Sequence, residues 1–147
     1  MATFIGEYKA KVDDKGRLIF PSAFKSLIEG PDFSFVVKKS LFADCLEMYT
    51  SAEWEQNSEE VKKRLNFFNR EHAIFWREYM RDTARIEPDE KLGRISIPKS
   101  LLEAIGIKKE VVFSGSNYMI EIWAKEKFEA QRLGSDEFAS LAEKILG

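Results

Sequence analysis

Hydrophobic and polar residues alternate in two short segments of nearly the same sequence. Residues 17–20 read RLIF and residues 94–97 read RISI, and each segment follows a glycine and precedes a proline. A period of two predicts a half-buried β-strand, with the second and fourth residues of each segment on the buried face. The proline suits the first turn of a helix, where its missing N–H would have no partner. The pattern therefore predicts a strand followed by a short helix at both places.

These segments belong to a repeat that covers most of the chain. An offset of 77 aligns Gly16 with Gly93, and further on CLEMYTSAEWE at 45–55 matches MIEIWAKEKFE at 119–129. Each copy is predicted to contain strand, acidic–basic turn, strand, short helix, strand, strand and helix. A unit of roughly 45 residues buries little core alone. We therefore predict an α+β fold in which two interlocked half-barrels form one pseudo-twofold barrel with flanking helices.

The repeat also suggests the domain organisation. Between the copies lies a charged segment with apolar residues at helical spacing, and another helical pattern ends the chain. Either helix can cover its own barrel or a neighbouring subunit. We expect four units: a first repeat at 4–57, a helical connection at 58–82, a second repeat at 83–130 and a C-terminal helix at 131–147.

Several residues are typical of helix ends. Gly30 and Gly106 follow the short helices as C-terminal caps should. Thr50 with Glu53 predicts a capping box, and Ser135 is expected to cap the last helix. The connecting helix is expected to pack through an apolar stripe: Phe68, His72, Phe75 or Trp76, and Tyr79. The last helix has a similar stripe: Phe138, Leu141, Ala142 and Ile145.

Composition and charge limit the class of protein. The 147 residues carry a net charge of −2, yet residues 61–94 hold nine basic side chains against six acidic ones. The local sign of the charge decides which face of a protein meets a polyanion. No segment is apolar enough for a membrane span, and no secretory signal is evident. A single cysteine, Cys45, excludes an internal disulfide and fits a reducing compartment. We expect a cytoplasmic protein.

The acidic–basic turns are the strongest candidates for chemistry. Asp13, Asp14, Lys15 and Gly16 suit a tight turn, because Asp accepts backbone N–H groups and Gly tolerates positive φ. A hairpin alone would explain both aspartates. It does not explain why an arginine follows each glycine.

The motifs resemble those of the MraZ family, bacterial regulators built from two fused swapped-hairpin units of the SpoVT-AbrB type. The resemblance covers FIGEY at 4–8, VDDKGRLIFPSAFK at 12–25, and GRISIP followed by VVFSG and IEIW. Its mark is Asp-x-x-x-Arg in both halves, which the first copy has as Asp13 and Arg17. In the second copy Glu90 stands at the aligned position, with Asp89 one residue earlier and Gly93 after it.

The resemblance implies a transcription regulator that forms a homo-oligomeric ring and binds tandem repeats in double-stranded DNA. The expected target lies upstream of the division and cell-wall gene cluster, and the protein is expected to be associated with the nucleoid. It implies no enzymatic activity, no cofactor and no small-molecule substrate. The alternative is a ring-shaped scaffold or an antitoxin-like partner-binding module. An enzyme comes third, because no acid–base or nucleophile constellation stands out.

On this interpretation the arginines act as bidentate forks for guanine or phosphate, and the lysines as mobile charges. Asp13 is expected to pair with Arg17 and hold it in place. The expected DNA-binding residues are Lys15, Arg17, Lys91, Arg94, Arg85 and Arg81. The expected supporting residues are Asp13, Asp14, Gly16, Asp89, Glu90 and Gly93.

Two isolated residues invite a metal or nucleophile interpretation. The chain has one His and one Cys, far apart, which is a poor ligand set. We expect His72 on a helix flank and Cys45 packed in a strand. Arg81 and Arg85 also admit a simpler interpretation, as part of a solvated helix face paired with Glu71, Glu78 or Asp82.

Overall fold

The order of strands and helices repeats once along the chain, as the sequence pattern predicts. The computed structural model describes residues 3–28, 34–89 and 93–147. Its elements are β1 (Glu7–Lys11), β2 (Arg17–Ile19), α1 (Ser22–Lys25), β3 (Phe35–Lys39), β4 (Leu46–Thr50), α2 (Ser51–Lys63), α3 (Arg70–Met80), β5 (Thr83–Ile86), β6 (Arg94–Ser96), α4 (Lys99–Ala104), β7 (Glu110–Ser116), β8 (Met119–Ala124), α5 (Lys125–Ala130) and α6 (Ser135–Leu146).

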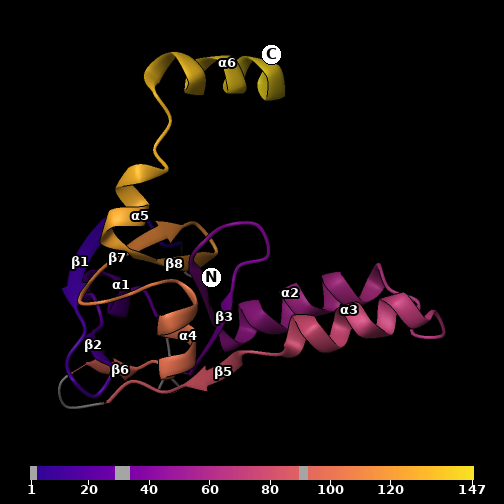
Figure 1. Ribbon diagram of the computed structural model, residues 1–147, viewed down its shortest axis with the longest axis horizontal. Helices are drawn as coiled ribbons and strands as arrows, with labels where there is room; N and C mark the ends of the chain where they lie inside the picture. Colours follow the sequence, from indigo (N-terminus) through magenta and orange to yellow (C-terminus); the bar gives the residue numbers. More distant parts are fainter. Residues whose placement is uncertain (1–2, 29–33, 90–92) are drawn as a thin grey trace.

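Six of the strands form one antiparallel sheet in the order β1-β7-β8-β4-β3-β5 (Figure 1). The first strand of each copy pairs with the third strand of the other copy, β1 with β7 and β5 with β3. The last strands of the two copies, β4 and β8, pair in the middle of the sheet. The two copies are therefore interlocked by backbone hydrogen bonds.

The remaining strands, β2 and β6, form a separate two-stranded ribbon. The α+β class is thus confirmed, but the strands do not join into the closed barrel that the repeat predicts. Each ribbon strand is only three residues long and ends two residues before a proline, Pro21 or Pro98, whose missing N–H prevents further pairing. The ribbon covers the sheet through side chains instead.

The main core lies between the sheet, the ribbon and the short helices α1 and α4. Leu18 and Ile95 enter it from the ribbon, Phe24 from α1 and Leu101 from α4, and all four are at most 1% exposed. Burying side chains of this size stabilises the fold by about 1.5–3 kcal/mol each. The alternation in RLIF and RISI therefore reflects this core.

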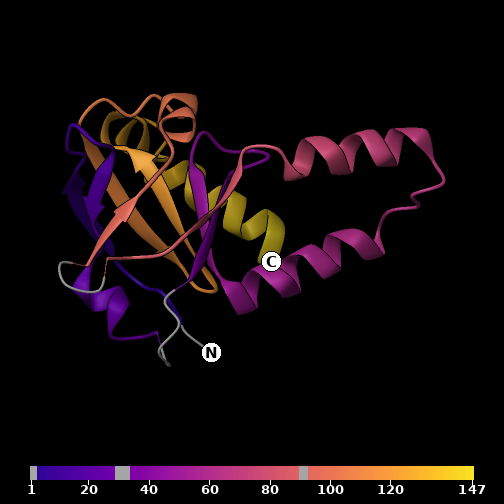
Figure 2. The same cartoon turned by 90° about the horizontal axis from the view of Figure 1, so that it is seen from below.

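The helices α2 and α3 form a hairpin whose base packs on the other face of the sheet. Trp54 and Tyr79 stack there with a ring-centroid distance of 6.2 Å, beside Val36 and Tyr49. Away from this base the hairpin projects from the sheet (Figure 2). Phe68 lies on the projecting part and is 101% exposed, whereas Tyr79 is 6% exposed, so only part of the expected stripe packs on its own sheet.

The connection expected at 58–82 is not one helix. Asn66 interrupts it, because its side chain accepts the N–H of Phe68 and its own N–H donates to His72 Nδ1. Such local side-chain bonds compete with helical ones. Asn69 then starts α3, where its Oδ1 accepts from Glu71 N at 2.9 Å.

The other expected helix ends give mixed results. Gly106 has φ of +68° after α4, which confirms it as a C-terminal cap. Thr50 Oγ1 accepts from Glu53 N at 3.3 Å, which confirms one of the two bonds of the expected capping box. Ser135 is wrong as a cap, since Gly134 precedes α6 without a side-chain cap bond and Ser135 is the first helical residue. Gly30 lies outside the described residues.

The C-terminal helix α6 stands clear of the sheet in Figure 1. Its apolar residues Phe138, Leu141 and Ile145 are 64%, 43% and 68% exposed. Within the described ranges, no helix is long and apolar enough to cross a membrane.

Candidate nucleic-acid interface

The first Gly-Arg turn is organised by the carboxylate of Asp13. Its Oδ1 accepts the backbone N–H groups of Lys15 at 2.9 Å and Arg17 at 2.8 Å, and its Oδ2 accepts from Arg17 Nε at 2.7 Å. The bond from the Arg17 N–H is the main reason that the pKa of Asp13 lies below its ordinary value. The predicted ion pair is confirmed. It uses the Nε–H and leaves the terminal amino groups of Arg17 outside this bond.

The second turn is one residue longer than the first. The N–H of Asp13 donates to the carbonyl of Arg17, four residues on, and the N–H of Asp89 donates to the carbonyl of Arg94, five residues on. The two bonds measure 3.0 and 2.7 Å. Asp89 therefore takes the backbone position of Asp13, while Glu90, the aligned residue, lies outside the described residues together with Lys91.

Glycine closes both turns and ties each turn to the other copy. Gly16 has φ of +77° and Gly93 of +64°, a conformation that favours glycine. The carbonyl of Gly93 accepts from Phe20 N at 2.7 Å, and that of Gly16 accepts from Ile97 N at 3.2 Å. These bonds fix the backbone of Arg17 relative to the backbone of Arg94.

The register of the ribbon decides where these arginines point. At its centre Leu18 pairs with Ile95, and both side chains are buried. Side chains alternate along a strand, and directly opposed residues share a face. The outward face of the ribbon therefore carries its other four residues: Arg17, Ile19, Arg94 and Ser96.

Arg85 and Arg81 are not brought to this face. Arg85 pairs with Val36, on the side of the sheet that carries α2 and α3, and its Nη1 donates to Ser34 Oγ at 3.0 Å and Ser51 Oγ at 3.1 Å. Arg81 ends α3, where its Nη1 lies 3.5 Å from a carboxylate oxygen of Glu78. The ion pair expected for Arg81 is thus present.

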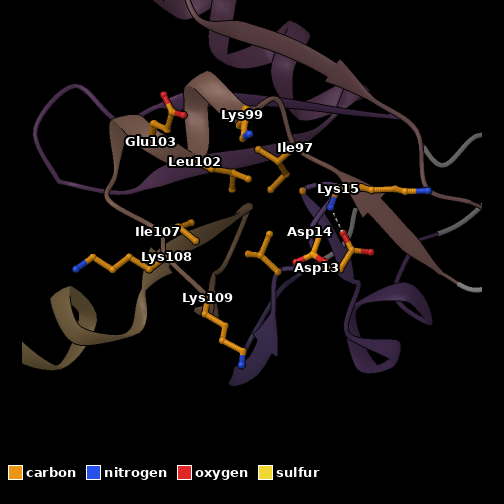
Figure 3. A pocket seen from close by; sticks show the side chains of 12 residues that line it. Asp13, Asp14, Lys15, Ile97, Lys99, Leu102, Glu103, Ile107, Lys108 and Lys109 are labelled. Carbon is orange, nitrogen blue, oxygen red and sulfur yellow. Dashed lines mark hydrogen bonds between the residues drawn. The ribbon is translucent and has the colours of Figure 1, made fainter.

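A hollow of about 700 Å³ lies beside the first turn, and sequence reasoning missed it (Figure 3). The turn forms one wall, and α4 with residues 107–109 forms the others. Exposed Asp14 and Lys15 lie at its edge, together with three lysines from the second copy: Lys99, Lys108 and Lys109. The two adjacent lysines at 108–109, close before the strand expected at 111–113, were the only hint of this hollow in the sequence. They lie beside the first turn because the two copies are interlocked.

The second turn has a neighbouring lysine too. A Cβ built on Gly93 would lie 3.8 Å from Nζ of Lys25, which ends α1. Each turn therefore has a cation beside it from the short-helix region of the other copy.

Cys45 and His72 lie apart from this surface. Cys45 is buried just before β4, and desolvation is the main cause that raises the pKa of its thiol to about 12. His72 lies on α3, where Nδ1 accepts the N–H of Asn66. Across the described part of the chain, no three His, Cys, Asp or Glu side chains form a group that could hold a metal ion.

The sequence is similar to those of known proteins along nearly the whole chain. The sequence model of the family described as "MraZ protein, putative antitoxin-like" matches residues 3–78 and 80–144. The "Transcriptional regulator MraZ" of Christiangramia forsetii is 41% identical over 153 aligned residues, covering 100% of this chain and 95% of the relative. That of Bacteroides thetaiotaomicron is 34% identical, covering 99% and 94%. The chain belongs to the MraZ family.

Proposed function

We propose that this chain is a sequence-specific DNA-binding regulator of transcription that reads double-stranded DNA through the β2–β6 ribbon. The observation that carries the proposal is the register that puts Arg17 and Arg94 on one outward face. The names of the relatives, both transcriptional regulators, support the same function.

The ribbon has the dimensions and chemistry for the major groove. That groove is about 12 Å wide and admits a two-stranded β-ribbon. An arginine held by a carboxylate can present its terminal amino groups to guanine O6 and N7 without losing much side-chain freedom on binding. Ile19, which is 63% exposed and pairs with Arg94 across the ribbon, suits contact with thymine methyl groups. Lys15 and Lys91 would add phosphate contacts.

Assembly of several copies is part of the proposal. One ribbon offers few cations, whereas a homo-oligomeric ring on tandem repeats multiplies its contacts through effective concentration. We place the target upstream of the division and cell-wall gene cluster and the protein in the cytoplasm, at the nucleoid. The role is non-enzymatic.

The proposed architecture is two fused swapped hairpins of the SpoVT-AbrB type, at 4–57 and 83–130. The exchange of first strands between the copies supports it. The segments 58–82 and 131–147 would then be additions to this unit. The first boundary falls inside α2, which runs to Lys63.

A mobility-shift experiment tests the proposal. The full-length protein is titrated against a duplex from upstream of its own gene and against a scrambled duplex of the same composition, at moderate salt. We expect a shift of the upstream duplex at concentrations at least tenfold lower than the scrambled one. Equal shifts, or none, would contradict sequence-specific binding.

An antitoxin-like module remains the second candidate, because α6 exposes an apolar face that a partner protein could cover. In that case deletion of α6 would abolish capture of the partner, and DNA would not shift.

A further inference from the structure

Lysines from the second copy continue the candidate DNA surface beyond the first turn. Lys99, at the start of α4, and Lys108 and Lys109, before β7, border the hollow whose other wall contains Lys15. Lys99, Lys108 and Lys109 are all exposed. We call these three residues the lysine rim.

Backbone hydrogen bonds fix the rim relative to the turn. The carbonyl of Lys109 accepts from Val12 N at 2.8 Å, which ties the rim to the residue before Asp13. The N–H of Ile107 donates to the carbonyl of Leu102 at 3.0 Å, which ties it to α4. The three lysines are thus presented at defined places beside the first turn.

The charges around the hollow favour an anion. Three acidic residues, Asp13, Asp14 and Glu103, line the hollow together with four lysines, Lys15, Lys99, Lys108 and Lys109. Asp13 is already paired with Arg17, so two carboxylates remain against four cations. The local sign is positive although the whole chain carries −2.

The shape of the rim distinguishes between anions. Figure 3 shows the ammonium groups of Lys15, Lys108 and Lys109 on different sides of the hollow, not converging on one point. A small anion would be held by convergent donors, whereas an extended polyanion meets spaced charges. Lysine also contacts phosphate without requiring the planar geometry of an arginine fork.

We propose that Lys99, Lys108 and Lys109 bind the phosphate backbone of the DNA whose bases the ribbon reads. This inference rests on the proposed function. It also makes the two halves unequal. The offset of 77 between the turns aligns Ser22 with Lys99. From Phe35 to its counterpart Val111 the offset is 76, which aligns Asp32 and Phe33 with Lys108 and Lys109. The first turn then has three phosphate-binding lysines beside it, whereas the second turn has Lys25, so each subunit binds its site in one direction.

The test compares two triple variants of the full-length protein. In the first, Lys99, Lys108 and Lys109 are changed to Gln. In the control, Lys62, Lys63 and Arg64 are changed to Gln, which removes the same charge near the end of α2, away from the ribbon. Both are titrated with the upstream and scrambled duplexes over a range of salt, with thermal unfolding and molar mass as checks.

We expect the rim variant to bind both duplexes more weakly and to the same extent, on the order of tenfold at 0.1 M salt for each phosphate that a rim lysine no longer binds. The slope of log K against log salt should become shallower by about 0.9 for each of these phosphates, up to about 2.7 for each subunit. The control should keep the wild-type slope.

A folded rim variant with the wild-type slope would overturn the inference while leaving the proposed function in place. A rim variant that lost only its preference for the upstream duplex would overturn it too, because phosphate contacts carry no sequence information. Wild-type protein that shifts neither duplex would instead overturn the proposed function.

Discussion

The arginines of the ribbon share one face, but turns of different length present them. Asp13 holds Arg17 through its side chain within a four-residue span, whereas the backbone bond of Asp89 reaches Arg94 over five. Base reading requires that a guanidinium be placed within hydrogen-bond reach of base edges, so a longer turn changes which bases it meets. We expect the two arginines to contribute unequally.

Arg17→Ala should reduce discrimination between upstream and scrambled DNA by about 1–3 kcal/mol for each engaged site. Arg94→Ala should have the smaller effect, because its turn departs from the family pattern. Lys15→Ala, the control, should weaken both duplexes equally and reduce the salt slope by about one. Fluorescence anisotropy with both duplexes measures all three. Full discrimination in a folded, oligomeric Arg17→Ala protein would refute base reading by this turn.

The pKa of the Asp13 carboxyl should lie below its ordinary value of 3.8. The Arg17 N–H, the Arg17 guanidinium and the Lys15 N–H all stabilise the charged form and so lower this pKa. A lowered pKa means that the ionised carboxylate stabilises the turn fully above pH 3.8, and that this contribution is lost as the pH falls through the lower folded-state pKa. Carbon-detected NMR of the carboxyl groups measures the midpoint. A midpoint at or above 3.8 would contradict the role of Asp13, and Asp13→Asn identifies the resonance.

At the level of elements, the sequence predicted the features that depend on residues close together along the chain. The strands before Pro21 and Pro98, the turn at Asp13 and the cap at Thr50 all follow from local pattern. The sequence did not predict the break between α2 and α3, because no Gly or Pro lies at the break. Asn66 interrupts the helix through hydrogen bonds to Phe68 and His72 instead.

The hollow beside the first turn was also missed, for a different reason. Its walls come from residues 12–16 and from residues 97–109, which only the exchange of strands brings together. Periodicity shows which face of an element is buried, but it does not show which distant element lies against it. The same holds for Arg85, whose position in the sequence suggested nearness to the second turn and whose strand points it to the other side of the sheet.

At Gly115, in β7, the backbone of the segment before β1 lies so close that no side chain would fit. A Cβ there would lie 2.5 Å from the carbonyl carbon of Phe4, in the segment that leads into β1. Gly115→Ala should push this segment away, loosen the buried Phe4 ring and destabilise the fold by about 1–3 kcal/mol. Urea unfolding measures the change. Gly134→Ala is the matched control, since its nearest contact is Glu137 Oε1 at 3.5 Å, and equal stability of the two variants would contradict the argument.

For the whole molecule, the exposed apolar face of α6 predicts association between copies. Phe138, Leu141 and Ile145 contribute nothing to the core of their own chain. Leu141→Glu should therefore lower the molar mass measured by light scattering toward the 17.0 kDa of one chain. Ser140→Glu, on the same helix, should leave the mass unchanged. A wild-type protein that is monomeric at micromolar concentration, or a Leu141→Glu protein of undiminished mass, would rule out this face as an interface.

The pairing of β1 with β7 also has a consequence for biosynthesis. It joins residues 7–11 to residues 110–114, so β1 leaves the ribosome about one hundred residues before the strand with which it pairs. At 5–20 residues per second that wait lasts roughly 5–20 seconds. During this time β1 could pair with strands of other nascent chains. Its alternating charges at Glu7, Lys9 and Lys11 oppose such pairing, since charged side chains along an edge strand discourage aggregation. The polar face of EYKAK thus protects the growing chain until translation has delivered the strand that β1 needs.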